Sequence, residues 1–200
     1  MPSDERRPRW ESRYREAPLT VAAPAGVLRE NAFLLPSVGQ ALDLACGRGG
    51  NALYMVQLGL SVTAWDFADA AIGNLLEIAQ AREVSLHAEV RDVIAAPPEP
   101  ATFDVICVSY FLARELVPAL VAALRPNGLI FYETFVREAV SDFGPGNPEY
   151  RLAPNELLHL FSGLRVLEYR EFGTVGDTTQ GRRDIATLVA QKRKQEDSQA

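Results

Sequence analysis

A strand-like run that breaks into a glycine turn and resumes as a helix is the feature that most constrains the fold. The stretch "ALDLACGRGGNAL", 41–53, is apolar apart from Asp43, turns at Gly47 and Gly49, and continues with helical apolar spacing. Such a turn lets the backbone approach a ligand at a helix N-terminus, which predicts a nucleotide-type cofactor. The glycines leave its identity open, because Gly47-x-Gly49-x-x-Ala52 also fits the dinucleotide fingerprint.

The rest of the interior alternates between short apolar runs and helical periodicity. Strands are expected at 40–45, 61–65, 86–91, 104–109 and 129–134, and helices at 51–59, 69–83, 112–125 and 154–162. This alternation predicts a parallel sheet with helices on both faces. Two last strands, 164–172 and 183–192, have no helix between them and should pair as an antiparallel hairpin. The predicted fold class is α/β, a seven-stranded sheet with five parallel strands and a C-terminal antiparallel hairpin.

Chain length and turn residues predict the domain organisation. With 200 residues, the chain can bury one sizeable core, so we expect one globular domain. Residues 1–39 are expected to form an N-terminal helical cap segment, 40–192 the α/β domain and 193–200 a disordered charged tail. The turn "RPNG", 125–128, should leave Gly128 free to take a positive φ.

Composition limits the partners that we expect. A formal net charge of −6 argues against nucleic-acid binding, which needs a basic face. No signal peptide or membrane-spanning run is apparent, so we expect a cytoplasmic protein without a membrane partner, as a monomer or weak dimer. Cys46 and Cys107, the two cysteines, end strand-like runs and should be inert core residues. No metal site is expected.

Two acids bear on the identity of the cofactor, and one of them separates the candidates. Asp66 ends the second expected strand, about 20 residues past the glycines, where it would hydrogen-bond the ribose of a dinucleotide or of S-adenosylmethionine. Asp43 discriminates, because a carboxylate beside a pyrophosphate costs Coulomb energy. The same carboxylate favours the ammonium and sulfonium groups of S-adenosylmethionine. The charge pattern therefore indicates the cationic cofactor.

The segment "LDLACGRGGNALYM", followed by "VTAWD" at the end of the next strand, resembles the class I S-adenosylmethionine-dependent methyltransferases. Within them it is similar to the tellurite-resistance (TehB-like) branch. The resemblance covers roughly residues 10–192 and implies the Rossmann-like class I methyltransferase fold, S-adenosyl-L-methionine as cofactor and S-adenosyl-L-homocysteine as product. The chain departs from the family at Ala45, where many members have glycine. It also lacks the histidine that the family places before the last strand and has only Arg182 and Arg183 there.

The resemblance implies a set of cofactor-binding residues at the strand ends. They are Asp43, Ala45, Gly47, Gly49, Asp66, Phe67, Asp92, Val93 and Ser109. Asp43, Gly47 and Gly49 would shape the methionine end of the pocket, and Asp66 would hold the ribose hydroxyls. Phe67 would pack on the adenine edge, with Asp92 and the Val93 backbone at the adenine amino group. Ser109 would lie at the mouth of the active site.

The substrate-side candidates are Trp10, Tyr14, Tyr110 and Glu133. Trp10 and Tyr14 share one face of an expected helix, which either covers the sheet edge or closes as a lid over the sulfonium. Residues 132–154 form a second candidate lid. Glu133, at the end of the fifth strand, is the best-placed titratable group, with a capping or salt-bridging role as the alternative.

Other polar residues receive no catalytic assignment. His87 and His159 are expected to be structural, Arg48 is given no role, and the catalytic residues stay unknown. The leading hypothesis is a methyltransferase that acts on a small-molecule thiol, amine, oxyanion or chalcogen. The alternatives are a non-catalytic S-adenosylmethionine-binding protein and an NAD(P)-dependent oxidoreductase, which the glycine match alone would support.

Overall fold

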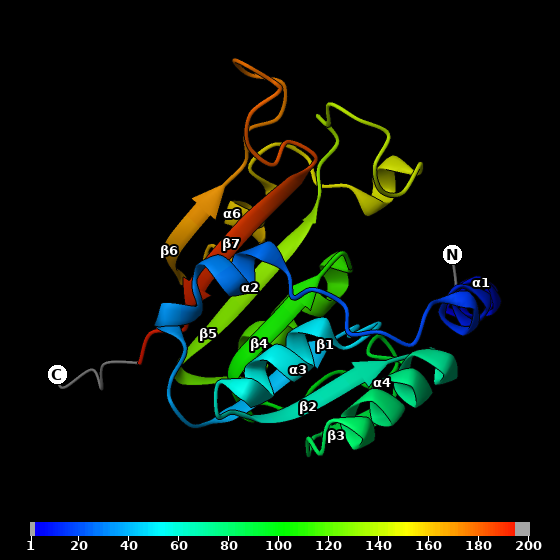
Figure 1. Ribbon diagram of the computed structural model, residues 1–200. Coiled ribbons are helices and arrows are strands. Elements are labelled where there is room, and N and C mark those ends of the chain that lie inside the picture. Colours follow the sequence, from blue (N-terminus) through cyan, green and yellow to red (C-terminus); the bar gives the residue numbers. More distant parts are fainter. Residues whose placement is uncertain (1–2, 195–200) are drawn as a thin grey trace, which may run out of the picture.

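The computed structural model describes residues 3–194 and contains one seven-stranded sheet in the order β3-β2-β1-β4-β5-β7-β6 (Figure 1). The strands are β1 (Gln40–Leu44), β2 (Ser61–Asp66), β3 (His87–Val90), β4 (Phe103–Ser109), β5 (Leu124–Phe135), β6 (Arg165–Arg170) and β7 (Ile185–Gln191). The first five are mutually parallel. The strand β7 pairs antiparallel with both β5 and β6. The predicted fold class is confirmed.

Helices cover both faces of this sheet. They are α1 (Ser3–Glu16), α2 (Gly26–Glu30), α3 (Gly50–Gln57), α4 (Asp69–Ala81), α5 (Val117–Ala123) and α6 (Glu156–Leu160), with short 3-10 turns at Ala32–Leu34, Arg114–Leu116 and Pro148–Tyr150. In Figure 1, α2, α3 and α4 lie on the near face, where their apolar residues share one core cluster with Phe131. The next residue, Tyr132, belongs to the opposite cluster with α5 and α6, as the period-2 alternation of a strand requires.

The N-terminal segment divides into two parts. The side chains of Val27 and Leu28, in α2, are fully buried in the near-face core. By contrast, α1 lies at the side of α4 (Figure 1). The domain boundary at residue 39 stays a prediction. Most of the tail predicted at 193–200 lies outside the described residues.

Two local expectations are wrong. The turn expected at 125–128 lies inside β5, and its left-handed residue is Asn127, with φ 67°, whereas Gly128 has no positive φ. Gly128 is instead needed for space, because a Cβ there would lie 2.9 Å from the Arg125 carbonyl oxygen. The second candidate lid, 132–154, begins inside β5, whose residues Tyr132–Phe135 are buried. The loop itself starts after the strand. Within residues 3–194, no helix is long and apolar enough to span a membrane.

Candidate functional site

The turn between β1 and α3 has an unusual run of left-handed backbone conformations. Ala45, Gly47 and Gly49 have φ values of 55°, 50° and 70°. The Cys46 amide donates to the Trp65 carbonyl and the Gly49 amide to the Cys46 carbonyl, which folds the turn back on the sheet. The conformation of Ala45 is one that glycine adopts without strain. This explains why glycine suits the position in the resembling family.

Asp43 is fully buried below this turn and joins β1 to α3. Its Oδ2 accepts a hydrogen bond from the Ala52 amide (3.0 Å), and its Oδ1 accepts one from Asn51 Nδ2 (3.2 Å). Burial and, to a smaller extent, the charge of Asp66 raise the pKa of Asp43 to about 7, against the opposing effect of these two hydrogen bonds. Ionisation of this carboxyl group at the turn is therefore costly.

Asp66 occupies the other side of the turn, at the end of β2. Its Oδ2 accepts from the Gly47 amide (2.9 Å) and its Oδ1 from the Ala68 amide (3.0 Å). Its side chain is buried, and burial raises its pKa. The structure thus brings the two predicted acids together around the glycine turn.

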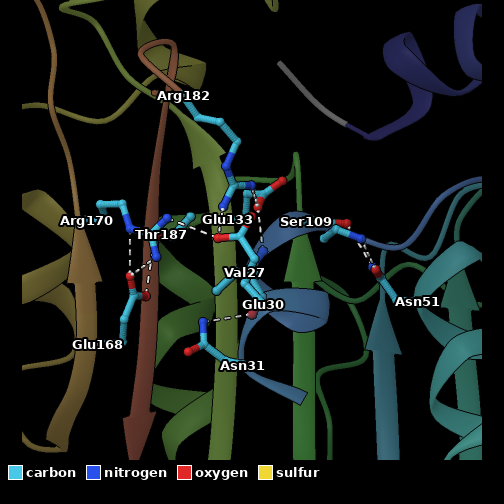
Figure 2. Close-up of polar contacts among 11 residues, drawn as sticks. Val27, Glu30, Asn31, Asn51, Ser109, Glu133, Glu168, Arg170, Arg182 and Thr187 are labelled. Carbon is cyan, nitrogen blue, oxygen red and sulfur yellow. Dashed lines mark hydrogen bonds and ion pairs between the residues drawn. The ribbon is translucent and has the colours of Figure 1, made fainter. Parts of the chain in front are cut away.

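Asn51 is a central residue that the sequence analysis missed. Its Nδ2 donates to Asp43 Oδ1 and to Ser109 Oγ (3.0 Å), and its Oδ1 accepts from the Ala25 amide (2.8 Å). Figure 2 shows the Asn51–Ser109 contact between α3 and the end of β4. Asn51 lies directly after the glycines in the turn that carries the family resemblance, a signal that could have identified it.

Arg48 also has a structural role that sequence did not reveal. Its Nη2 donates to the carbonyl oxygens of Pro18 (3.0 Å) and Thr20 (2.8 Å) and to the Thr20 hydroxyl. The glycine turn is therefore tied to the segment that leaves α1.

Helix α1 docks on the same edge of the sheet. Glu11 accepts from the Asp69 amide (2.5 Å) and the Ala70 amide (3.2 Å), so it caps the start of α4. The rings of Trp10 and Tyr14 stack with centroids 5.6 Å apart, as expected for one helix face. The Tyr14 hydroxyl lies 2.8 Å from the position that a Cβ on Gly47 would occupy.

The three predicted adenine contacts follow the ends of β2 and β3. Phe67, after β2, is partly buried, and Val93 is buried in the far-face core. Asp92 Oδ1 accepts from the amides of Ile94 (3.0 Å) and Ala95 (3.4 Å), within its own turn. Their proposed contacts stay predictions. His87 and His159 are exposed.

The ends of β4 and β5 form the second half of the site. Ser109 and Glu133 are register partners, and the Tyr110 amide donates to the Glu133 carbonyl (2.8 Å). Glu133 is fully buried, and its Oε2 accepts from the Val27 amide (2.9 Å) and from Arg182 Nη1 (2.7 Å). Figure 2 shows this carboxylate between Arg182 and Val27. Glu133 thus forms a salt bridge with Arg182, and its substrate-side role stays a prediction.

The Tyr110 ring lies in a small aromatic group beside Glu133. Its centroid is 5.2 Å from that of Phe135 and 6.4 Å from that of Phe143, and these two are 5.3 Å apart. Tyr110 has a φ of 55°, and its side chain is 47% exposed. Burial, and then the charge of Glu133, raise the pKa of its phenol. A half-exposed aromatic surface therefore adjoins a buried carboxylate.

The charged groups around the turn fit a cationic cofactor such as S-adenosylmethionine. Two buried carboxylates, Asp43 and Asp66, face the turn, and their mutual repulsion contributes to the raised pKa of Asp43. A ligand that carries positive charge would relieve this repulsion, whereas a pyrophosphate would increase it. Because Gly47 has no Cβ, the Tyr14 hydroxyl can approach the left-handed turn closely.

Solved structures with the same architecture define the class of fold. TehB from Haemophilus influenzae superposes with a TM-score of 0.69 and 25% identity, over 92% of this chain and 67% of that protein. A protein described in "Conversion of a Disulfide Bond into a Thioacetal Group during Echinomycin Biosynthesis" superposes with a TM-score of 0.72 and 22% identity, over 96% and 94% of the two chains. The fold is the Rossmann-like fold of class I S-adenosylmethionine-dependent methyltransferases.

Sequence comparison places the chain within that class. The family model described as "Tellurite resistance protein TehB" matches residues 20–184, and the chain belongs to this family. A relative in Haemophilus influenzae, named "Probable S-adenosyl-L-methionine-dependent methyltransferase TehB", is 30% identical over 162 residues. The match covers 76% of this chain and 57% of the relative, so the chain spans little more than half of that protein.

Proposed function

We propose that the chain is an S-adenosylmethionine-dependent methyltransferase with a small-molecule acceptor. The observation that carries the proposal is the pair of buried carboxylates, Asp43 and Asp66, that flank a glycine turn at the carboxyl ends of β1 and β2. Membership of the TehB family supports it. The same charge pattern disfavours an NAD(P)-dependent oxidoreductase, because a pyrophosphate would add negative charge beside two acids.

The cofactor-binding residues divide by their place at the sheet edge. Asp66 would hold the ribose hydroxyls, and the backbone of Ala45, Gly47 and Gly49 would approach the methionine end. Asp43 would act through its charge and through Asn51, to which it is hydrogen-bonded. Phe67, Asp92 and Val93 would form the adenine end. When bound, S-adenosylmethionine supplies an electrophilic methyl group on a sulfonium.

The chain's own contribution to methyl transfer is positioning and exclusion of water. Ser109 is fixed by Asn51, so the end of β4 is held rigidly against the turn. Trp10 and Tyr14 would cover the cofactor. Glu11 holds their helix in place against the start of α4. Alignment of acceptor and methyl group in a dry site can contribute several kcal/mol to the lowering of the activation barrier.

The remaining aspects of the proposal concern the setting in which the chain acts. The formal net charge of −6 supports a small-molecule substrate over nucleic acid. We propose a cytoplasmic protein that is a monomer or a weak dimer. Analytical ultracentrifugation would test the oligomeric state.

Calorimetric titration with S-adenosylmethionine, S-adenosyl-L-homocysteine and NADH tests the cofactor. We expect the first two to bind, and Asp66→Ala to weaken their binding by about 1–3 kcal/mol, because a charged hydrogen bond to the ribose is lost. Asp104→Asn, at the opposite end of the sheet, is the control and should bind as the wild type does. Binding of NADH alone would refute the proposal. Binding without release of S-adenosyl-L-homocysteine in the presence of thiols, amines and oxyanions would instead indicate a non-catalytic binding protein.

A further inference from the structure

One oxygen of the Glu133 carboxylate has no partner. The side chain is fully buried, and Oε2 makes both of its polar contacts, to the Val27 amide and to Arg182. Among the described residues, Oε1 makes no hydrogen bond, and its neighbouring donor group is the Tyr110 phenol, whose pKa is raised by burial and by its interaction with the Glu133 carboxylate. A buried carboxylate oxygen without a donor is costly, so Oε1 takes a hydrogen either from the half-exposed Tyr110 phenol or from a ligand that displaces this phenol at the proposed methyl-transfer site.

The surrounding charges indicate which ligand the site can accept. Arg182 is shared between Glu133 (2.7 Å) and Glu30 (3.0 Å), so its positive charge is already compensated. Arg170 is likewise shared between Glu30 (3.0 Å) and Glu168 (3.1 Å). The connected group contains three carboxylates and two guanidinium groups, an excess of one negative charge (Figure 2).

This excess disfavours an inorganic oxyanion. An oxyanion would have to compete with two carboxylates for Arg182 and would lie near the Glu133 charge. A neutral group that carries an N–H, S–H or O–H bond meets no such repulsion, and it can donate its hydrogen to Oε1. The electrostatics and the unpaired oxygen therefore favour the same kind of acceptor.

The neighbouring surface suits an organic molecule. Tyr110 and Phe143 are 47% and 58% exposed, and both lie against Phe135. These rings offer an apolar surface next to the carboxylate. Entry to Oε1 requires a neighbouring side chain to move, and Tyr110 has solvent on one side.

We propose that Glu133 Oε1 accepts the proton of the methyl acceptor, and that the acceptor is an organic thiol, amine or hydroxyl compound with an apolar body. The inference rests on the proposed function. In the step, the acceptor's lone pair bonds to the methyl carbon, the methyl–sulfur bond breaks with its electron pair left on sulfur, and the acceptor proton goes to Oε1. The two oxygens thus divide their roles, since Oε2 holds α2 and Arg182 in place.

Two matched variants test this division. Glu133→Gln removes the negative charge and the proton acceptor but keeps an oxygen for the Val27 amide. Asp104→Asn makes the same chemical change in a carboxylate that also accepts from one backbone amide and one arginine, at the other end of the sheet. Both variants are first checked for cooperative unfolding and for S-adenosyl-L-homocysteine binding. Failure of the wild type to bind S-adenosyl-L-homocysteine would refute the proposed function itself.

The first measurement is calorimetric binding of selenite to protein saturated with S-adenosyl-L-homocysteine. Glu133→Gln should bind selenite about tenfold more tightly than the wild type, because the connected group then has no excess negative charge and Arg182 keeps one carboxylate partner, Glu30, instead of two. Asp104→Asn should match the wild type. Tighter selenite binding by the wild type than by Glu133→Gln would overturn the proposal.

The second measurement is the methylation rate of phenylmethanethiol and aniline, both of which are neutral and carry an S–H or N–H bond at pH 7. Glu133→Gln should lower it about a hundredfold or more, the range for loss of a general base. A purely structural role predicts that binding of selenite and methylation of organic acceptors fall together, an outcome that would refute the inference. If Glu133→Gln does not fold, Glu133→Asp serves instead. This variant keeps the charge, so selenite binding should stay weak while organic acceptors react more slowly.

Discussion

Two acid–arginine pairs at opposite ends of the sheet use the same hydrogen-bond pattern. At the amino end, Asp104 Oδ2 accepts from the Gln40 amide (2.8 Å) and from Arg125 Nη1 (2.8 Å). At the carboxyl end, Glu133 Oε2 accepts from the Val27 amide and from Arg182 Nη1. Each pair joins a strand to a neighbouring segment through one backbone amide and one guanidinium group.

Their surroundings differ. The side chains of Asp104 and Arg125 are 31% and 41% exposed, so solvent screens their attraction. The Glu133 side chain is 0% exposed and Arg182 is 33% exposed. The amino-end pair is a surface ion pair, whereas the carboxyl-end pair holds a buried charge beside the buried acids of the glycine turn. Burial, rather than the bonding pattern, therefore distinguishes the surface ion pair of Asp104 from the candidate reaction site at Glu133.

The largest expected effect is a pH dependence that comes from Asp43 at the carboxyl end. Its pKa is raised from 3.8 to about 7, so the folded state binds more protons than the unfolded state between these values. The free energy of unfolding should therefore fall as pH rises through this window, by up to about 4 kcal/mol in total, and then level off. Urea unfolding from pH 4 to 8 measures it.

Asp43→Asn should make that decline shallower, with a residual slope from Asp66, whose pKa is also raised. Asp104→Asn is the control and should retain the decline that Asp43 causes. If the free energy of unfolding of Asp43→Asn fell with pH as steeply as that of the wild type, Asp43 would not be the cause of the pH dependence.

The second prediction compares the two arginines. Arg182→Ala leaves Glu133 buried without its ion-pair partner and should lower the free energy of unfolding by about 2–3 kcal/mol, the lower part of the range for such breaks because Arg182 is partly exposed. Arg125→Ala should cost below about 1 kcal/mol, as for exposed pairs. Urea unfolding at pH 8 measures both losses. Equal losses of unfolding free energy in the two variants would show that the buried ion pair contributes no more to stability than the exposed one.

The smallest effect concerns the glycine beside each pair. A Cβ on Gly26 would lie 1.7 Å from Arg182 Nη1, so Gly26→Ala should displace the guanidinium and cost about 1–2 kcal/mol. In an Arg182→Ala background the same change should cost nothing. Gly39 has a φ of 151°, so Gly39→Ala should cost about 1–2 kcal/mol even when Asp104 is replaced by alanine. Thermal unfolding of the single and double variants measures this coupling. A full cost of Gly26→Ala in the Arg182→Ala background would refute the steric explanation.

Sequence pattern predicted the sheet because alternation of strands and helices, and the missing helix before β7, are local signals. It also placed Asp43, Asp66, Ser109 and Glu133 at one edge, since parallel strands end together. Sequence could not predict the partner of Glu133, because Arg182 is 49 residues away in a loop and is brought near only by the packing of β7.

The missed contacts share a physical cause. Arg48 and Glu11 bind backbone groups of distant segments, and no spacing rule connects such pairs. The wrong expectation at Gly128 arose because asparagine and glycine both tolerate the left-handed conformation. The structure uses Asn127, whose amide donates to the Lys192 carbonyl. A hydrogen bond to a residue distant in sequence thus accompanies the left-handed conformation of Asn127, although either residue could adopt it locally.

The position of β7 between β5 and β6 sets an order for assembly during synthesis. Residues 185–191 form both of these strand pairs. The strands β5 and β6 are therefore not joined until residues 185–191 have left the ribosome. Arg182 emerges just before β7, about fifty residues after Glu133 has left the tunnel. The nascent chain therefore carries the Glu133 carboxylate in water until β7 inserts. Burial of that charge and closure of the sheet are expected to occur as one late event.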